Sequence, residues 1–363
     1  MPDALICTTD QVSAAWLTQV LTGSGALLAG SVVSFELQTG RGNWSTNAAI
    51  QVGYSLNSQG ARPRRLFLKM VNANFEGGAF DSSEVDYYTR DYTGVIIAPL
   101  VTCYSAVFSE EFQRYHLLLE DVSATHFDAE MKAPTLEYGL ALSEGLAVLH
   151  AHRWGVERFS KVGARLPAAG QVHRFVEISM AGVEKLLLSL PSRLEPGWGD
   201  AIDSIYAKLP AAMLNRLSDE RGFSLVHGDT GQKNILVPRV GDRPIYIIDR
   251  QPFDWALTTW LGVYDLAYAM VLDWDVETRR QLEIPVLRNY HDRLIENGVS
   301  DYPWDLLFSD YQLCVGMCVL VATEYFRNGL NSPWVPSWLL MLQRALTACQ
   351  DINYNCPGDL ANR

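Results

Sequence analysis

The chain of 363 residues lacks the features that mark several large classes of protein. It contains no run of about 18 apolar residues, the length that a membrane-spanning helix needs, and no basic stretch followed by an apolar one at its start. Its 29 lysines and arginines are outnumbered by 41 acidic residues, which gives a net charge of −12. Neither nucleic acid nor an anionic membrane is therefore expected as a partner, and we expect a cytoplasmic protein.

Cysteine is also sparse, with six residues scattered along the chain and mostly set in apolar surroundings. Cys314 and Cys318 have the i, i+4 spacing of one helix face. No histidine or second cysteine pair nearby completes the ligand set that zinc requires. Buried free thiols in a reducing compartment are the expected state.

What the chain does have is enough apolar sequence for a large folded core. Apolar residues make up 48% of the chain and charged residues 19%, and there is no repeat, low-complexity tract or long linker. The length allows two domains or lobes. Extensive disorder is excluded by this composition.

The most informative segment is Leu225–Val237, which continues after a short interval into Tyr246–Asp249. It places Asp229, then Asn234 five residues later, and then Asp249 at the end of a β-branched apolar run. The apolar stretches are typical of short buried strands, so the polar residues would lie on the connecting loop. Polar groups in such apolar sequence are costly unless they are paired or bind metal. Phosphoryl transfer from ATP uses such a set, because it needs a carboxylate for the hydroxyl proton and oxygen ligands for magnesium.

These motifs resemble those of the aminoglycoside phosphotransferase and ecdysteroid-kinase-like family. That family carries His-Gly-Asp, as at His227–Asp229, and Ile-Asp without a following Phe-Gly, as at Ile248–Arg250. The resemblance implies that Asp229 is the catalytic base, that Asn234 and Asp249 are the ligands of Mg²⁺, and that ATP is the phosphoryl donor.

The resemblance also implies the protein-kinase-like fold, an α+β fold with two lobes. Residues 1–120 would form a nucleotide-binding lobe around a small five-stranded antiparallel sheet. Residues 121–363 would form a mainly helical lobe that carries the catalytic loop and an acceptor cleft. The pattern of apolar residues predicts a first helix with Thr9 and Asp10 at its N-cap. It further predicts strands at 32–37, 48–54, 66–71, 100–108 and 115–119, and helices at 82–92, 135–152, within 172–220, and at 277–296, 303–327 and 336–352.

Lys69 ends the third predicted strand, in otherwise apolar sequence. A lysine there is costly unless it is paired, and by resemblance it would bind phosphate. Its expected partner is Glu84 on the following helix, with Asp81 and Asp86 as competitors. The alternative is a strand-edge lysine whose ammonium group reaches water.

A partial glycine-rich turn precedes this lysine. Gly40 and Gly42 match the first two glycines of such a loop, and Ser45 stands in place of the third. Glycines there would let backbone N–H groups approach phosphate oxygens closely. The stretch Leu117–Val122 resembles the hinge that holds adenine through backbone groups, here those of Glu120 and Val122. The expected apolar walls, which can equally be core residues, are Ile50, Phe67, Leu236 and Ile248.

Four further residues lie in or near the loop and its motifs. By resemblance, His227 packs beneath it, and Asp265 caps a helix or braces the loop. Lys233 is open to two interpretations, a contact with the transferring phosphoryl group or exposure to solvent. Arg250 departs from the Phe or Trp common in the family, which argues against aromatic stacking at that position.

The acceptor is predicted less sharply than the reaction. Acidic residues next to tryptophans are typical of a site for an amine-bearing ring compound. The candidates are Asp254, Trp255, Trp260, Asp273, Trp274 and Asp275. Asp273, Asp275 and Glu277 can equally be the solvated start of a helix. An aminoglycoside or another hydroxylated amine is the expected acceptor. A neutral natural product such as a sterol, sugar or macrolide stays open, as does a nucleotide-binding pseudokinase, which Lys69, Asp229, Asn234 and Asp249 argue against.

Overall fold

The computed structural model describes residues 4–42, 44–75, 78–189 and 194–352 of the chain. The chain divides into two compact units. The first unit comprises Met1–Gly94, Leu100–Phe127 and Pro238–Asp254, and the second comprises Val95–Pro99, Asp128–Val237 and Trp255–Arg363. The first unit thus extends past residue 120, the expected boundary between the lobes. It also includes Pro238–Asp254, which that boundary would assign to the C-terminal lobe.

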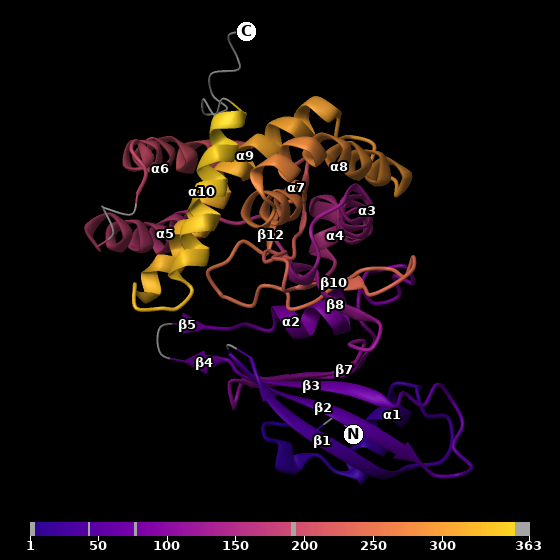
Figure 1. The fold of residues 1–363 in the computed structure, drawn as a ribbon. Helices are drawn as coiled ribbons and strands as arrows, with labels where there is room; N and C mark the ends of the chain where they lie inside the picture. Colours follow the sequence, from indigo (N-terminus) through magenta and orange to yellow (C-terminus); the bar gives the residue numbers. More distant parts are fainter. Residues whose placement is uncertain (1–3, 43, 76–77, 190–193, 353–363) are drawn as a thin grey trace. The chain divides into compact units, whose positions relative to one another are not determined.

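The first unit is built on the predicted five-stranded antiparallel sheet, whose strand order is β1-β2-β3-β7-β6 (Figure 1). The strands are β1 Val32–Arg41, β2 Ser45–Tyr54, β3 Arg65–Asn72, β6 Cys103–Ser109 and β7 Arg114–Glu120. A small ribbon of β4 (Asn74–Phe75) and β5 (Gly78–Ala79) follows β3. Buried residues alternate along much of β2 and β3, which explains why one face of the sheet is buried there.

Helix α1 (Ala14–Gly23) packs on that buried face, in one core with the inward residues of β2 and β3. The helix begins later than predicted, because Ser13 is the N-cap and its hydroxyl accepts from the N–H of Trp16 at 3.1 Å. Thr9 starts a separate 3₁₀ turn instead. A hydroxyl at the N-cap satisfies a backbone donor that the helix itself cannot.

The opposite face of the sheet carries Lys69. In the register of β2 and β3, Asn47 lies opposite Lys69 and Ala49 lies opposite Phe67. Ile50 lies opposite Leu66, and both belong to the core with α1. The prediction of Ile50 as an adenine wall is therefore wrong, because side chains alternate along a strand and Ile50 points to the other face.

The predicted helix at 82–92 is present in two parts, α2 (Ser83–Asp86) and a π-helical turn η2 (Tyr87–Asp91). The segment Pro238–Asp254, with the short strand β11 (Tyr246–Ile247), joins the first unit through specific bonds. The Arg239 N–H donates to the Thr125 carbonyl at 2.8 Å, and the Tyr87 hydroxyl donates to the Ile247 carbonyl at 3.4 Å.

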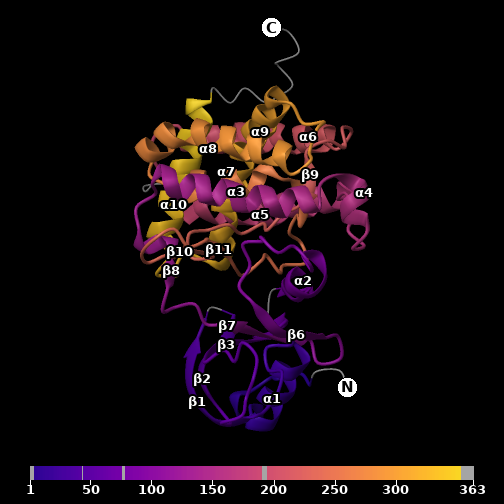
Figure 2. The same cartoon turned by 90° about the vertical axis from the view of Figure 1, so that its right-hand side faces the viewer.

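The second unit is mainly helical, as predicted, and α3 runs beside α8 within it (Figure 2). Short strands β9 (Phe223–Leu225) and β12 (Thr259–Leu261) pair antiparallel, and β8 (His126–Asp128) and β10 (Ile235–Pro238) lie where the chain passes between units. Its helices are α3 Leu136–His152, α4 Gly155–Ser160, α5 Ala169–Ser189, α6 Trp198–Arg216, α7 Val263–Tyr268, α8 Val276–Glu296, α9 Trp304–Glu324 and α10 Val335–Asp351. Shorter helical turns are η3 Ala129–Met131, the π-helical η5 Ala269–Asp273, and η6 Tyr325–Asn328.

Helix α9 and the turn after it form the one described helix that is long and apolar enough, by length and composition, to cross a membrane. Of its most apolar window, 72% is buried inside the protein. Burial of this kind is typical of the central helix of a folded core. Cys314 and Cys318 lie on this helix as buried free thiols, and Cys349 on α10 is a third.

Candidate active site

One buried carboxylate binds the backbone of the loop between β9 and β10. Asp265, near the start of α7, accepts from the N–H of His227 at 2.7 Å and from the N–H of Gly228 at 2.9 Å. The Asp265 backbone carbonyl accepts from the hydroxyl of Thr230 at 2.6 Å. Gly228 has φ of +82°, a conformation that residues with a side chain adopt only under strain. Of the two roles expected for Asp265, the structure shows the bracing one.

Asp265 is itself held in its charged form. Burial alone would raise the pKa of this carboxyl, but the imidazoles of His150 and His227 and the Gly228 N–H bring the pKa below its usual value. The His150 Nε2 atom lies 3.0 Å from Asp265, and its Nδ1 atom lies 2.7 Å from the hydroxyl of Tyr290. His150 and His227 thus support the fold of the loop, which is the role expected of His227, and the brace extends to α3 and α8.

Asp229 and Asn234 are linked across the loop by a direct bond. The side-chain N–H₂ of Asn234 donates to the backbone carbonyl of Asp229 at 2.9 Å, and its backbone N–H donates to Gly231 at 2.8 Å. Because the amide nitrogen donates to the loop backbone, the amide oxygen is the side-chain atom of Asn234 that can bind a cation. An oriented amide oxygen fits the preference of Mg²⁺ for oxygen ligands.

A tyrosine that the sequence reasoning did not single out contacts Asp229. The hydroxyl of Tyr268 donates to Oδ1 of Asp229 at 2.7 Å, and it lies 3.1 Å from the hydroxyl of Tyr325. A signal for this contact exists in the sequence, because Tyr268 follows Asp265 by three residues on one helix. Residues at that spacing lie on the same face.

In the first unit, Lys69 forms the predicted ion pair with Glu84. The Lys69 Nζ atom lies 2.6 Å from Oε1 of Glu84 and 3.1 Å from Oδ1 of Asp249. The hydroxyl of Tyr115 donates to the second oxygen of Glu84 at 2.5 Å. Burial alone would lower the pKa of Lys69, but the two carboxylates outweigh it and raise the pKa, so the ammonium stays charged. The geometry presents a fixed cation next to the Asp249 carboxylate.

Asp249 has two features of a residue under functional constraint. Its φ is +59°, a strained conformation for a non-glycine residue. Its side chain is 45% exposed, although Ile245 and Ile247 shortly before it are buried. A carboxylate held near a lysine and open to solvent fits an oxygen ligand for Mg²⁺.

Arg250, the departure from the aromatic residue of the family, forms a buried ion pair. Its guanidinium lies 2.5 Å from the carboxylate of Asp91, and both side chains are almost fully buried. Asp91 also accepts from Arg90 at 2.9 Å. Asp91 ends the helical segment that begins at Ser83 and carries Glu84, so the pair ties the residue after Asp249 to that segment.

The predicted glycine turn is the end of the β1–β2 hairpin. Gly40 pairs with Asn47, and the Gly42 N–H donates to the Ser45 carbonyl at 3.0 Å. A Cβ on Gly42 would lie 2.5 Å from the Ser45 hydroxyl oxygen, so a larger residue there would require the Ser45 side chain to move. Asn43 lies outside the described residues. The geometry supports a tight turn at these positions.

The predicted hinge has part of its backbone already engaged. The Glu120 N–H donates to Thr102 at 2.8 Å, and the Val122 carbonyl accepts from the N–H groups of Thr125 and His126, each at 2.9 Å. Adenine binding at this stretch would use other backbone groups. Two of the predicted walls lie on short segments of different units and are half-buried, namely Leu236 and Ile248.

The predicted tryptophan wall of the acceptor site is wrong. Trp260 and Trp274 are fully buried, and Trp260 donates to the sulfur of Met317 at 3.0 Å. Trp255 is also buried, between the ring of Phe175 and the guanidinium of Arg327. These large aromatic residues, which have apolar neighbours in the sequence, pack in the core of the second unit, where such residues are most often found.

The acidic residues predicted near the acceptor site have different structural roles. Asp275 is the N-cap of α8 and accepts from the N–H of Thr278 at 3.0 Å, and Glu277 pairs with Arg280 at 2.7 Å. Asp275 and Glu277 therefore form the start of a helix, which was the alternative to a role in acceptor binding. Asp254 is exposed and belongs to the first unit.

Asp273 instead lies against the loop, where its carboxylate accepts from the N–H of Gln232 at 2.6 Å. Burial raises the pKa of Asp273 to about 7, and the charges of Asp229 and Glu130 add to the rise. The N–H of Gln232 and the guanidinium of Arg344 oppose it. Asp273 is therefore the member of the acidic cluster that the structure brings beside Asp229.

Partly exposed aromatic rings lie on other residues than those predicted. Tyr325 stacks on Trp338 of α10, with ring centroids 5.8 Å apart and planes at 18°. Trp334 is 49% exposed, and the ammonium of Lys233 lies 4.4 Å from its ring centroid. Lys233 also lies 3.7 Å from Glu130. Its ammonium is thus directed to these neighbours rather than left fully in solvent.

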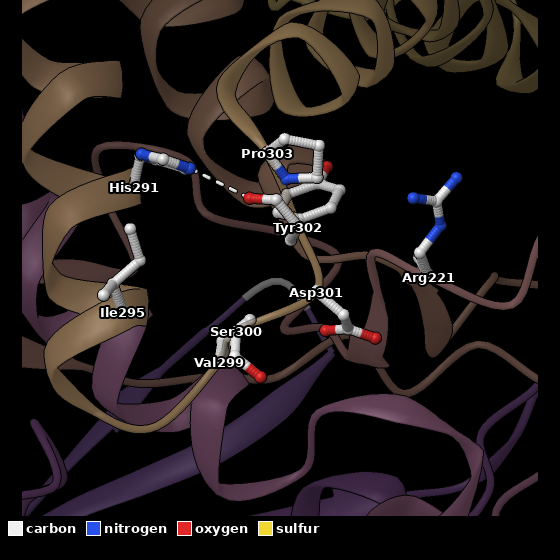
Figure 3. A pocket seen from close by; sticks show the side chains of 8 residues that line it. All are labelled: Arg221, His291, Ile295, Val299, Ser300, Asp301, Tyr302 and Pro303. Carbon is white, nitrogen blue, oxygen red and sulfur yellow. Dashed lines mark hydrogen bonds between the residues drawn. The ribbon is translucent and has the colours of Figure 1, made fainter.

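A separate cavity of about 330 Å³ lies at the connection between α8 and α9 (Figure 3). Within it, Nε2 of His291 lies 2.9 Å from the backbone carbonyl of Tyr302. None of the predicted site residues lines it. Its lining residues are Arg221, His291, Ile295, Val299, Ser300, Asp301, Tyr302 and Pro303.

Among the described residues, no group of three or more His, Cys, Asp and Glu side chains is placed to hold a metal ion. Each of the two predicted ligands, Asn234 in the second unit and Asp249 in the first, carries an oxygen atom of the kind that binds Mg²⁺. The donor set is the hard-oxygen type that suits Mg²⁺ rather than the nitrogen and sulfur type that suits zinc.

The structure is similar to solved structures of small-molecule kinases. A choline kinase from Cryptosporidium parvum has a TM-score of 0.55 at 10% identity, covering 88% of this chain and 90% of that chain. A spectinomycin phosphotransferase in complex with ADP and spectinomycin has a TM-score of 0.54 at 14% identity, covering 94% and 99%. A Plasmodium vivax ethanolamine kinase has a TM-score of 0.55 at 11% identity, covering 88% and 84%. The sequence matches no protein-family model and no curated protein.

These similarities extend over most of each chain, and at this level of identity they concern the fold. The chain has the protein-kinase-like fold of choline and ethanolamine kinases and aminoglycoside phosphotransferases. The α+β fold predicted from the sequence is confirmed.

Proposed function

We propose that this chain transfers the γ-phosphoryl group of ATP to a hydroxyl group of a small molecule. The observation that carries the proposal is the 227–234 loop. Its Asp229 and Asn234 are joined by a direct bond, and the buried Asp265 braces its backbone. Such a loop on this fold is the arrangement that phosphoryl transfer to a hydroxyl requires.

In the proposed reaction, Asp229 accepts the proton of the acceptor hydroxyl while the oxygen attacks the γ-phosphorus. A bond forms between that oxygen and phosphorus, the bond from phosphorus to the β-phosphate oxygen breaks, and ADP leaves. Lys69, fixed by Glu84, supplies positive charge to the phosphates. Magnesium bound through Asn234 and Asp249 would neutralise charge on the phosphate oxygens.

For the acceptor we propose a hydroxylated amine. The support is chemical: Asp229 lies in the loop and Asp273 lies beside it, and partly exposed aromatic rings lie nearby in the same unit. Carboxylates and aromatic rings together attract an ammonium group. The choline and ethanolamine kinases that share the fold are named for acceptors that carry both a hydroxyl and a cationic nitrogen.

The test is a screen of ATP consumption with magnesium and a panel of hydroxylated compounds, both cationic and neutral. We expect turnover with a cationic amine, and an acceptor KM that rises with ionic strength, because exposed charges are screened over about 8–10 Å. Turnover with a neutral sterol, sugar or macrolide, at a KM indifferent to salt, would replace the amine by a neutral acceptor. Magnesium–ATP binding without turnover on any compound would support a pseudokinase instead.

A further inference from the structure

Helix α7 and the π-helical turn η5 contact the loop at three successive points. Asp265 binds the backbone at the start of the loop, Tyr268 binds the Asp229 carboxylate, and Asp273 binds the Gln232 N–H. In a regular α-helix the next residue on this face would be 272 rather than 273. The wider π-helical turn at Ala269–Asp273 brings Asp273 onto the face, and such turns often occur at functional sites.

The middle contact has a defined direction of hydrogen bonding. An ionised carboxylate only accepts, so the single proton of the Tyr268 hydroxyl is given to Asp229. Burial, together with the charge of Asp229, raises the pKa of Tyr268 well above its usual value, so the phenol keeps this proton. The Tyr268 oxygen can then only accept from Tyr325, 3.1 Å away. The bonds therefore run from Tyr325 to Tyr268 to Asp229.

Both rings are held in place by their neighbours. Tyr268 is only 3% exposed, and the ring of Tyr264 meets it edge-on at 6.2 Å. Tyr325, the first residue of η6, is stacked on Trp338. Rings that cannot turn fix the hydroxyl groups, and through them the orientation of the carboxylate.

We propose that Tyr268 is a positioning residue for Asp229, and that Tyr325 orients Tyr268. The inference rests on the proposed function, in which Asp229 takes the proton of the acceptor hydroxyl. The Tyr268 hydroxyl, by its bond to Oδ1, holds the Asp229 carboxylate in one orientation. The proton moves from the acceptor oxygen to the Asp229 carboxylate as the bond to phosphorus forms, and Tyr268 keeps its own proton throughout.

The experiment compares steady-state kinetics of the wild type with Tyr268→Phe, Tyr325→Phe and the double variant. We expect Tyr268→Phe to lower kcat about tenfold, because one hydrogen bond to a charged group is lost, with KM for ATP unchanged. Tyr325→Phe should lower kcat about two- to threefold. The double variant should match Tyr268→Phe alone, because Tyr325 acts only through Tyr268.

The matched control is Tyr302→Phe. The hydroxyl of Tyr302 donates to the carboxylate of Asp310 at 2.7 Å, a bond of the same type and length in the same unit, and Asp310 makes no part of the loop. Tyr302→Phe should lower thermal stability about as much as Tyr268→Phe but leave kcat at the wild-type value. If loss of stability alone lowered kcat, the kcat of both variants would therefore fall equally.

The outcomes separate the inference from the proposed function. If Asp229→Asn is inactive while Tyr268→Phe keeps wild-type kcat, the positioning role is overturned and the proposed function stands. If the two Phe changes multiply in the double variant, Tyr325 does not act through Tyr268. If Asp229→Asn keeps full activity, the proposed function and the inference both fail.

Discussion

The two units hold the carboxylates of the candidate site in different ways. In the first unit, Glu84 and Asp249 share Lys69, so two acidic groups are paired with one cation. In the second unit, Asp229 is held by a hydroxyl group, and Asp273 by a backbone N–H. A hydroxyl or an N–H group orients a carboxylate without neutralising it. The comparison suggests that the first unit is built to present charge to phosphate, and the second to keep a carboxylate ready for a proton.

The largest effect is expected from a change of Asp249, which tests the role assigned to the first unit. Asp249→Ala should abolish magnesium-dependent ATP binding, because it removes a carboxylate ligand from an oxygen-only site. Lys69→Met should lower kcat but keep magnesium–ATP affinity within severalfold, because the metal ligands remain. Titration calorimetry with ATP, with and without magnesium, measures both. Unchanged magnesium–ATP affinity in Asp249→Ala would remove this residue from the metal site.

The next effect concerns the brace beneath the loop. Asp265→Asn replaces one acceptor oxygen by a donor that faces the N–H of His227 or Gly228. We expect the free energy of unfolding to fall by about 2–3 kcal/mol, the cost of leaving buried donors unpaired, and kcat to fall at least tenfold. Urea denaturation and steady-state kinetics measure the two effects.

Asp310→Asn is the matched control for the brace. Asp310 is a buried carboxylate of the same unit, held by Arg216 at 2.6 Å and by Tyr302. It should lose comparable stability and keep kcat under conditions in which the variant is folded. A fall in kcat equal to that of Asp265→Asn would mean that the loop responds to any loss of stability in this unit.

The smallest effect is the pH dependence contributed by Asp273. Its pKa is raised to about 7 in the folded state, against about 3.9 in the unfolded chain. Between these values the folded protein holds a proton that the unfolded chain has lost, so stability falls as pH rises through the window. Asp273→Asn should reduce this fall by on the order of 1–2 kcal/mol between about pH 5 and pH 8.

Asp275→Asn tests the sign of that prediction. The Thr278 side chain and N–H lower the pKa of Asp275, so its contribution to stability is present above the unfolded pKa and is lost in acid. Urea midpoints measured across the pH range should change in opposite senses for the two variants. The same slope for Asp273→Asn and wild type would contradict the raised pKa.

The sequence predicted the parts of the site that are set by local pattern. Lys69 in an apolar strand predicted a paired lysine, and the family resemblance favoured Glu84 over Asp81 and Asp86 as the partner that the structure shows. The apolar runs around Asp229 and Asn234 predicted a loop between short strands. In each case, the cost of leaving a charge or polar group unpaired in apolar sequence determined the structure.

Other parts depend on register and packing, which the sequence does not state. Ile50 was placed on the wrong face, because β2 carries apolar residues on both faces and only its pairing with Leu66 of β3 shows which face α1 covers. Trp260 and Trp274 were predicted to form the wall of a binding site, but both are buried in the core. The sequence alone does not distinguish these two locations for an aromatic residue. The contact of Asp273 depends on a π-helical turn, which regular helical spacing does not predict.

The central claim is that Asp229 is the base in a transfer of phosphate from ATP to a hydroxyl group. The most direct measurement follows the γ-phosphoryl group of isotopically labelled ATP in the presence of magnesium and an acceptor found by the screen. In the wild type we expect the label on the acceptor as a phosphate ester. With Asp229→Asn we expect nucleotide affinity to persist and transfer to fall by a factor of about a hundred or more. Label found only as inorganic phosphate in the wild type, or equal transfer by Asp229→Asn, would contradict the account.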